Sequence, residues 1–326
     1  MLERETAFTL FDDTVEDTRV SRESLTRCLS TLLGGLDDNG IAALLTDHFS
    51  CAYEYAQLIV GKDTCRRMSL LYNPHRLSTP AKGRKTIVEL LKDKRMASGL
   101  ARAYLAKAKG SSSRELLYQV IQWGTNNSQL CTEFPPFLAR KLCLAYGVNS
   151  RSRVLDPCAG WGGRMIGVST ICDSYTAFEP STKTFSGLTK LSQRLSEFSP
   201  AFHAQLHCQP FEESAHTPDS FDFALTSPPY YDTEIYSQET TQSAIKYKTF
   251  DMWVSGFFEP LIKKTMTALA PHGVFVLNIG SRQYPIESAL RLIAGSYSMK
   301  KLKNFMTISG LGKDNEKGES FFEIRK

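Results

Sequence analysis

Apolar and polar positions alternate with a helical period over the first 60 residues, where Ile41, Leu44, Leu45, Phe49 and Tyr53 share one face. The same spacing predicts helices near 86–108 and 113–123. Residues 72–80 carry two prolines among polar side chains, which predicts an irregular connection. We therefore expect residues 1–125 to form a mostly helical N-terminal extension.

From residue 126 the pattern changes to short apolar runs that alternate with helical spacing, which is typical of an α/β domain with a mostly parallel sheet. Strands are predicted at 153–155, 175–178, 203–208, 221–226 and 273–279, with helices at 164–171, 183–198, 252–269 and 287–294. Two further strands near 302–308 and 321–324 have no helix between them, which predicts an antiparallel hairpin at the sheet edge. Residues 126–326 are thus expected to form the second domain.

The composition is typical of a folded intracellular protein. Of the 326 residues, 42% are apolar, and no uninterrupted apolar run reaches the length of a membrane span. The N-terminus lacks the layout of a signal peptide, so we expect a location in the cytoplasm or nucleoid and no membrane contact. The 8 cysteines are scattered without a C-x-x-C pair, which predicts reduced thiols and no metal site.

Charge is distributed unevenly along the chain. Residues 1–61 hold 4 basic and 11 acidic side chains, whereas residues 62–114 hold 14 basic and 3 acidic ones. A basic segment beside a near-neutral domain is typical of an attachment that binds a polyanion, and solvated helix faces are the alternative. The candidates for contact with nucleic-acid phosphates are Arg66, Arg67, Lys82, Arg84, Lys85, Lys94 and Arg95.

A glycine-rich turn, DPCAGWGG at 156–163, follows the first predicted strand of the second domain. Asp156 ends that strand, and Gly160 and Gly162 let the backbone pass close to a ligand. Glu179 ends the next strand 23 positions later, which is the spacing of a ribose-hydroxyl acceptor; a helix cap is the alternative. The turn is not G-x-G-x-x-G and Arg164 follows it, so a nucleoside cofactor other than NAD is favoured.

A second motif, Ser227-Pro228-Pro229-Tyr230, ends the strand at 221–226. Prolines lack backbone donors, so an amine placed here meets the Ser227 hydroxyl and the Pro228 carbonyl as acceptors, which turns its lone pair toward an incoming methyl group. Tyr230 would stack on the base, a contact worth roughly 1–3 kcal/mol. A rigid loop with a surface tyrosine is the alternative. Carbon-5 methylation needs a cysteine in this loop, and Cys158 lies in the other motif, so we predict direct in-line transfer to nitrogen and a structural role for Cys158.

The region from about residue 131 to 326 resembles the class I methyltransferases that use S-adenosylmethionine, specifically the DNA amino-methyltransferases that modify adenine N6 or cytosine N4. The turn at 156–162 is similar to the family's cofactor motif, and the SPPY run is similar to its catalytic motif. The resemblance implies that the run EFPPFL at 133–138 closes over the methionine moiety, that Phe211-Glu212 flank the adenine ring, and that the Rossmann-like sheet has the strand order 3-2-1-4-5-7-6. The cofactor-binding residues expected are Phe134, Pro135, Asp156, Pro157, Gly160, Trp161, Gly162, Glu179, Phe211 and Glu212.

One departure from the family concerns target recognition. Family members that read a defined DNA sequence usually carry a large insertion or a C-terminal domain; only about ten residues separate Phe211 from the fourth predicted strand, and we expect no such region here. Recognition then falls to the N-terminal extension, to the polar loop at 231–249 or to a partner subunit. DNA is expected ahead of RNA, and the serine of the motif is commoner among cytosine-N4 members. The alternatives are an RNA or protein N-methyltransferase, and a catalytically inactive subunit that keeps the fold and binds nucleic acid.

Overall fold

The computed structural model describes residues 35–46, 49–80, 85–86, 89, 93, 131, 133–215, 218–280, 283–302 and 319–326. The chain divides into two compact units, Met1–Phe49 with Pro74–Thr132 and Ser50–Asn73 with Glu133–Lys326. Apart from a few isolated positions, the helices predicted at 86–108 and 113–123 lie outside the described residues.

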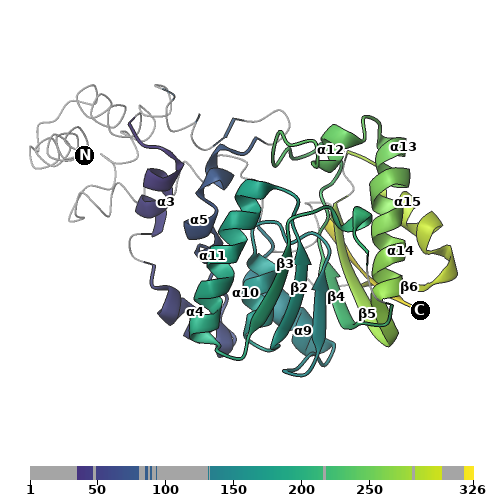
Figure 1. Ribbon diagram of the computed structural model, residues 1–326, viewed down its shortest axis with the longest axis horizontal. Helices are drawn as coiled ribbons and strands as arrows, with labels where there is room; N and C mark the ends of the chain where they lie inside the picture. Colours follow the sequence, from purple (N-terminus) through teal and green to yellow (C-terminus); the bar gives the residue numbers. More distant parts are fainter. Residues whose placement is uncertain are drawn as a thin grey trace, which may run out of the picture. The chain divides into compact units, whose positions relative to one another are not determined.

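A seven-stranded sheet forms the centre of the larger unit (Figure 1). Its strands are β1 (Arg153–Asp156), β2 (Ser174–Phe178), β3 (His203–His207), β4 (Phe221–Thr226), β5 (Leu269–Gly280), β6 (Ser298–Leu302) and β7 (Glu319–Arg325). The order is β3-β2-β1-β4-β5-β7-β6; β1 to β5 pair in parallel, and β7 is antiparallel to β5 and β6. The predicted parallel sheet with a final antiparallel hairpin is confirmed.

Helices surround this sheet. Helix α10 (Gly163–Ser169) packs against α9 (Pro136–Ala145) and α11 (Thr182–Phe198), and α14 (Glu259–Ala268) and α15 (Ile286–Ile293) contact β5. The helix predicted at 252–269 begins as α13 (Phe250–Trp253) and passes through a π-helical turn, η3 (Val254–Phe258), before α14. The π turn brings the buried rings of Trp253 and Phe258 into a stack with centroids 5.2 Å apart.

The segment Ser50–Asn73 belongs to the same unit as the sheet. It holds α4 (Cys51–Ile59) and α5 (Met68–Tyr72). The Tyr55 hydroxyl lies 3.0 Å from the Ser169 hydroxyl of α10, and the Ser69 hydroxyl donates to the Glu133 carboxylate. The domain boundary expected near residue 125 stays a prediction, but these contacts show that part of the expected extension packs with the sheet.

The smaller unit contains α3 (Asp38–Thr46) and the short 3-10 helix η1 (Pro74–Ser78), which contact each other. The Ser78 hydroxyl donates to Asp38 at 2.5 Å. The prediction of an irregular connection at 72–80 is therefore wrong for η1, because Pro74 stands at the first helical position, where its missing N–H costs nothing.

The strand predicted near 302–308 overlaps the observed β6 at Leu302. The observed β6 ends at Leu302, and residues 303–308 lie outside the described part of the chain. Edge strands often carry lysines, and the Lys301 ammonium lies 5.5 Å from the centre of the Phe322 ring of β7. A search for apolar runs overlooks such a strand.

Candidate active site

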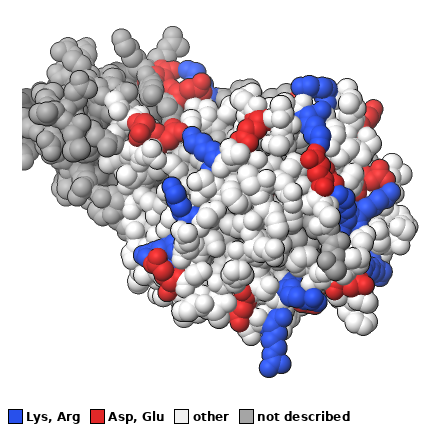
Figure 2. Space-filling view, in the orientation of Figure 1, with Lys and Arg blue, Asp and Glu red and all other residues white. Residues whose placement is uncertain are grey.

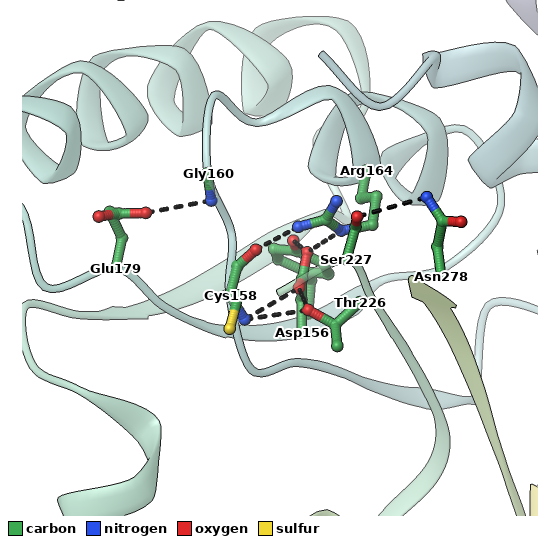
Figure 3. Close-up of polar contacts among 9 residues, drawn as sticks. Asp156, Cys158, Gly160, Arg164, Glu179, Thr226, Ser227 and Asn278 are labelled. Atoms are coloured by element: carbon green, nitrogen blue, oxygen red, sulfur yellow. Dashed lines mark hydrogen bonds and ion pairs between the residues drawn. The ribbon is translucent and has the colours of Figure 1, made fainter. Parts of the chain in front are cut away.

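The two sequence motifs meet at one edge of the sheet. Because β2, β1, β4 and β5 are neighbours that run in parallel, their carboxyl ends lie side by side. This arrangement brings together Glu179 after β2, Asp156 at the end of β1, Ser227 after β4 and Asn278 near the end of β5 (Figure 3). The sequence predicted the first three as site residues.

Asp156 is fully buried and its carboxylate accepts four hydrogen bonds from the protein. The donors are the Tyr175 hydroxyl at 2.6 Å, the Arg164 Nε at 2.7 Å, the Thr226 hydroxyl at 2.8 Å and the Cys158 amide at 3.2 Å. A carboxylate has about four lone-pair sites, so these donors use its accepting capacity. Asp156 therefore holds the turn in shape, and no acceptor position on it is left for a ligand.

Arg164 also stabilises the turn. Its guanidinium donates to the carbonyl of Cys158 and lies 5.2 Å from the centre of the Phe134 ring. At 4% exposure this cation is stabilised by its ion pair with Asp156, because an unpaired buried charge is very costly. Burial raises the pKa of the Cys158 thiol well above its usual value, which fits the structural role predicted for that residue.

The glycines of the turn divide into two kinds. Gly160 and Gly162 have positive φ values of 55° and 93°, which L side chains rarely adopt. A Cβ on Gly163 would overlap the carbonyl oxygen of Phe134, so this glycine lets α10 approach the segment before α9. A Cβ on Gly160 would have no neighbour closer than 4.0 Å, so its surroundings leave space for a ligand.

Glu179 differs from Asp156 in what its carboxylate contacts. It accepts the Ser181 amide at 2.9 Å and the Gly160 amide at 3.1 Å. These contacts fit both the predicted role of Glu179 at a cofactor site and the alternative role as a cap beside the start of a helix. These are its only donors among the described residues, so two of its four lone-pair sites are open to further donors, the number that two ribose hydroxyls would need. Burial raises the pKa of Glu179 to about 7.

The SPPY motif places two hydroxyls together. The Ser227 and Tyr230 hydroxyl oxygens are 3.0 Å apart, and the Asn278 side-chain amide donates to each at 3.3 Å. Pro228 is buried, whereas Pro229 and Tyr230 are partly exposed. The motif therefore combines hydroxyl oxygens with a half-exposed aromatic ring at the strand end.

Tyr231 anchors the loop that follows the motif, and sequence reasoning did not single it out. It has φ of 57°, an uncommon backbone conformation for a bulky residue, and its side chain is buried. Its hydroxyl donates to the Lys248 carbonyl at 2.8 Å, and its ring lies edge-on to Tyr284 at 4.9 Å. Because the sequence of this loop is mostly polar, it does not predict that Tyr231 is buried.

The same loop reaches the start of α11. The Glu239 carboxylate accepts the Thr182 amide at 3.1 Å and the Thr182 hydroxyl at 3.0 Å. Two further carboxylates of the loop are hydrogen-bonded: Asp232 accepts the Tyr284 hydroxyl at 2.5 Å, and Glu234 accepts the Tyr236 hydroxyl. The loop is thus held at both ends by side-chain contacts.

The remaining expected cofactor residues lie around the turn. Pro157, Trp161, Phe134, Phe211 and Glu212 are buried, and Pro135 is partly exposed at the start of α9. The Phe211 ring packs edge-on against Phe178 at 5.1 Å, so it contacts the sheet. The Trp161 carbonyl accepts from the Asn73 side chain at 3.3 Å, a contact with the segment Ser50–Asn73 that the sequence did not predict.

Three of the seven basic candidates are described. Arg66 pairs with Asp63, Lys85 pairs with Asp93 at 2.7 Å, and Arg67 precedes α5. Lys82, Arg84, Lys94 and Arg95 lie outside the described residues. Figure 2 shows basic and acidic side chains interspersed over the described part of the visible face. Contact of these seven residues with nucleic acid stays a prediction.

Within the described part of the chain, no group of three or more His, Cys, Asp or Glu side chains could hold a metal ion. No helix in that same part is long and apolar enough to cross a membrane.

No protein-family model and no curated protein matches this chain. Solved structures similar to it include an rRNA methylase from Streptococcus thermophilus, 15% identical over 60% of this chain and 97% of that chain, with a TM-score of 0.39. A tRNA methyltransferase from Aquifex aeolicus is 12% identical over 60% and 70% of the two chains, with a TM-score of 0.41. A 16S rRNA methyltransferase from T. thermophilus, in complex with AdoMet and guanosine, is 16% identical over 60% and 44%, with a TM-score of 0.39.

The observed strand order is the one that the resemblance to class I methyltransferases implied. Five parallel strands, a glycine turn after the first of them and an antiparallel β7 between β5 and β6 make this the class I methyltransferase fold.

Proposed function

We propose that this protein transfers a methyl group from S-adenosylmethionine to the exocyclic amine of a nucleic-acid base, cytosine N4 or adenine N6. One observation carries the proposal: Ser227 and Tyr230 at the end of β4 lie one strand from the turn and two strands from Glu179. The proposed nucleoside site and the proposed amine site would therefore share one edge of the sheet.

The residues around the turn fit an adenosyl group. Glu179 has two acceptor positions for the ribose hydroxyls, and Gly160 leaves room beside it. When bound, S-adenosylmethionine supplies an electrophilic methyl group. By the resemblance to class I methyltransferases, Phe134, Pro135 and Phe211 would hold this group together with Pro157 and Trp161 of the turn.

On the amine side, Ser227 and Pro228 each accept one amino proton, which leaves the nitrogen lone pair free. That lone pair would form the new N–C bond while the methyl–sulfur bond of the donor breaks and S-adenosylhomocysteine leaves, and the nitrogen would afterwards release one proton to water. The residues would act mainly by positioning the two reactants, an effect worth up to about 7–11 kcal/mol, so little acid–base chemistry is required. Tyr230, which is partly exposed, would support the flat base by stacking.

The acceptor polymer is proposed to be DNA, on the resemblance of the two motifs. RNA presents the same amines, so both polymers belong in the same experiment. A target in a duplex must first be flipped out at a cost of a few kcal/mol, so single strands should be modified faster.

The test is transfer of labelled methyl from S-adenosylmethionine to double-stranded DNA, single-stranded DNA and RNA, followed by nucleoside digestion and mass analysis. We expect a methylated cytosine or adenine amine, lost in Pro229→Ala and Tyr230→Ala. The matched controls are Pro218→Ala and Tyr53→Ala, because both residues are exposed and lie outside the site. Binding of S-adenosylhomocysteine without transfer to any polymer would contradict the nucleic-acid substrate and favour a protein amide. Absence of any cofactor binding would favour the inactive subunit.

A further inference from the structure

Asn278 occupies an unusual place in the central strand β5. It interrupts the apolar run that includes Leu277 and Ile279, and its side chain is 4% exposed. The amide nitrogen donates to both hydroxyls of the SPPY motif at 3.3 Å. The amide oxygen Oδ1 is buried and has no hydrogen-bond partner among the described residues.

Gly280 lies two positions further on, on the same face of the strand. A Cβ at Gly280 would come within 2.7 Å of Tyr230 Cε2 and 2.8 Å of Tyr230 Cδ2. The ring of Tyr230 therefore rests on the backbone of β5 while Asn278 contacts its hydroxyl. Asn278 and Gly280 together hold the side chain of Tyr230 in place.

The proton count of this cluster restricts what Ser227 can do. The Asn278 amide has two protons and gives one to each hydroxyl oxygen, which leaves one lone pair on the Ser227 oxygen. The two hydroxyls then share one hydrogen bond, in either direction. If Tyr230 donates, Ser227 has no lone pair left for an amine and its own proton points outward. If Ser227 donates to Tyr230, Ser227 keeps one lone pair for an amino proton.

The second arrangement is the one that methyl transfer needs. A Ser227 proton pointing at the target would bind the lone pair of the amine nitrogen and block its attack. With that proton directed to Tyr230, Ser227 accepts one amino proton and the nitrogen lone pair stays free.

We propose that Asn278 is a positioning residue for the methyl acceptor, which together with Tyr230 keeps the Ser227 hydroxyl oriented as a single acceptor. This inference rests on the proposed function. A purely structural amide would not explain the unpartnered Oδ1, because a buried acceptor without a partner is destabilising. A leucine of similar size would suit the surrounding apolar strand.

The experiment compares Asn278→Leu and Asn278→Asp with the wild-type protein. The aspartate has the same shape and accepts a proton from each hydroxyl, so it also keeps the Ser227 proton away from the amine when it is ionised. We expect the transfer rate to fall at least tenfold in Asn278→Leu. Asn278→Asp should recover to within about threefold of wild type as the pH rises and the carboxylate ionises. Thermal unfolding should show Asn278→Leu to be as stable as wild type or more stable.

A second readout is independent of activity. With 3-fluorotyrosine placed at position 230, a ring that is held in one position gives a discrete 19F resonance. This resonance should broaden or average in Asn278→Leu. Asn278→Leu should also bind S-adenosylhomocysteine like the wild type.

The outcomes separate this inference from the proposed function. Unchanged 19F spectra, or full transfer by Asn278→Leu, would overturn the role of Asn278 while methyl transfer by the wild type stands. Equal losses in the leucine and aspartate variants at every pH would also overturn it, because only a structural role predicts them. If the wild type methylates no polymer, the proposed function fails, and the 19F comparison still decides whether Asn278 holds Tyr230.

Discussion

Lowering the pH from 8 to 5 should weaken the binding of an adenosyl ligand, because it protonates Glu179. Burial raises the pKa of this carboxyl to about 7, so its charge changes within that range. The Glu179 carboxylate already accepts hydrogen bonds from the amides of Gly160 and Ser181, and only its ionised form has two further acceptor positions. The ribose hydroxyls would therefore bind more tightly above pH 7 than below it.

The magnitude follows from the two hydrogen bonds. A hydrogen bond to a charged group contributes about 1.5–3 kcal/mol and a neutral one about 0.5–1.5 kcal/mol, so protonation weakens each bond by about 1 kcal/mol. Two bonds amount to about 2 kcal/mol, or about thirtyfold in Kd. By linkage, the bound ligand lowers the pKa of Glu179 by the same free energy, so the dependence levels off at the acid end. We expect Kd to be flat above pH 8 and about twentyfold higher at pH 5.

The assay is calorimetric titration with S-adenosylhomocysteine and with methylthioadenosine. Methylthioadenosine has the same adenine and ribose but lacks the amino-acid group, so any pH dependence that it shares with S-adenosylhomocysteine belongs to the protein or the nucleoside. Titrations in buffers of different ionisation enthalpy should show proton release on binding near pH 6. Glu179→Gln serves as the control and should bind weakly with little pH dependence.

Two results would refute this reasoning. A Kd for methylthioadenosine that is constant from pH 5 to 8 would mean that Glu179 does not contact the ribose or does not titrate there. An unchanged pH dependence in Glu179→Gln would assign the titration to another group. Circular dichroism at each pH excludes loss of the fold as the cause.

Substitutions around the turn should separate stability from ligand affinity. Gly163→Ala should destabilise the protein by several kcal/mol in urea unfolding, because its Cβ overlaps the Phe134 carbonyl. Gly160→Ala has open space around its Cβ, so it should cost only about 1–2 kcal/mol for its positive φ yet weaken S-adenosylhomocysteine binding at least tenfold in calorimetry. Tyr175→Phe removes one of four donors to buried Asp156 and should cost about 1–3 kcal/mol in urea unfolding, with ligand affinity changed less than in Gly160→Ala.

The sequence predicted most of the sheet because its strands follow local rules. Apolar positions mark β1, β2, β4 and β5, and the carboxylates at the ends of β1 and β2, Asp156 and Glu179, were found by position alone. What it missed depends on contacts between distant segments. Asn73 donates to the turn from 88 positions away, and a polar residue before a proline gives no local sign of that. Asn278 resembles an ordinary strand-end amide until Ser227 is brought beside it by the pairing of β4 with β5.

Asp156 and Glu179 end neighbouring strands, yet their environments give them different tasks. Asp156 uses its accepting capacity on four protein donors, one of which is the Thr226 hydroxyl. Thr226 also accepts the Cys158 amide at 3.1 Å and directly precedes Ser227, so one residue joins the glycine turn to the start of the SPPY motif. A buried hydrogen-bond network thereby fixes the distance between the glycine turn and the SPPY motif, the proposed nucleoside and amine sites. Glu179, with lone pairs to spare and a pKa of about 7, is the carboxylate left to respond to a ligand.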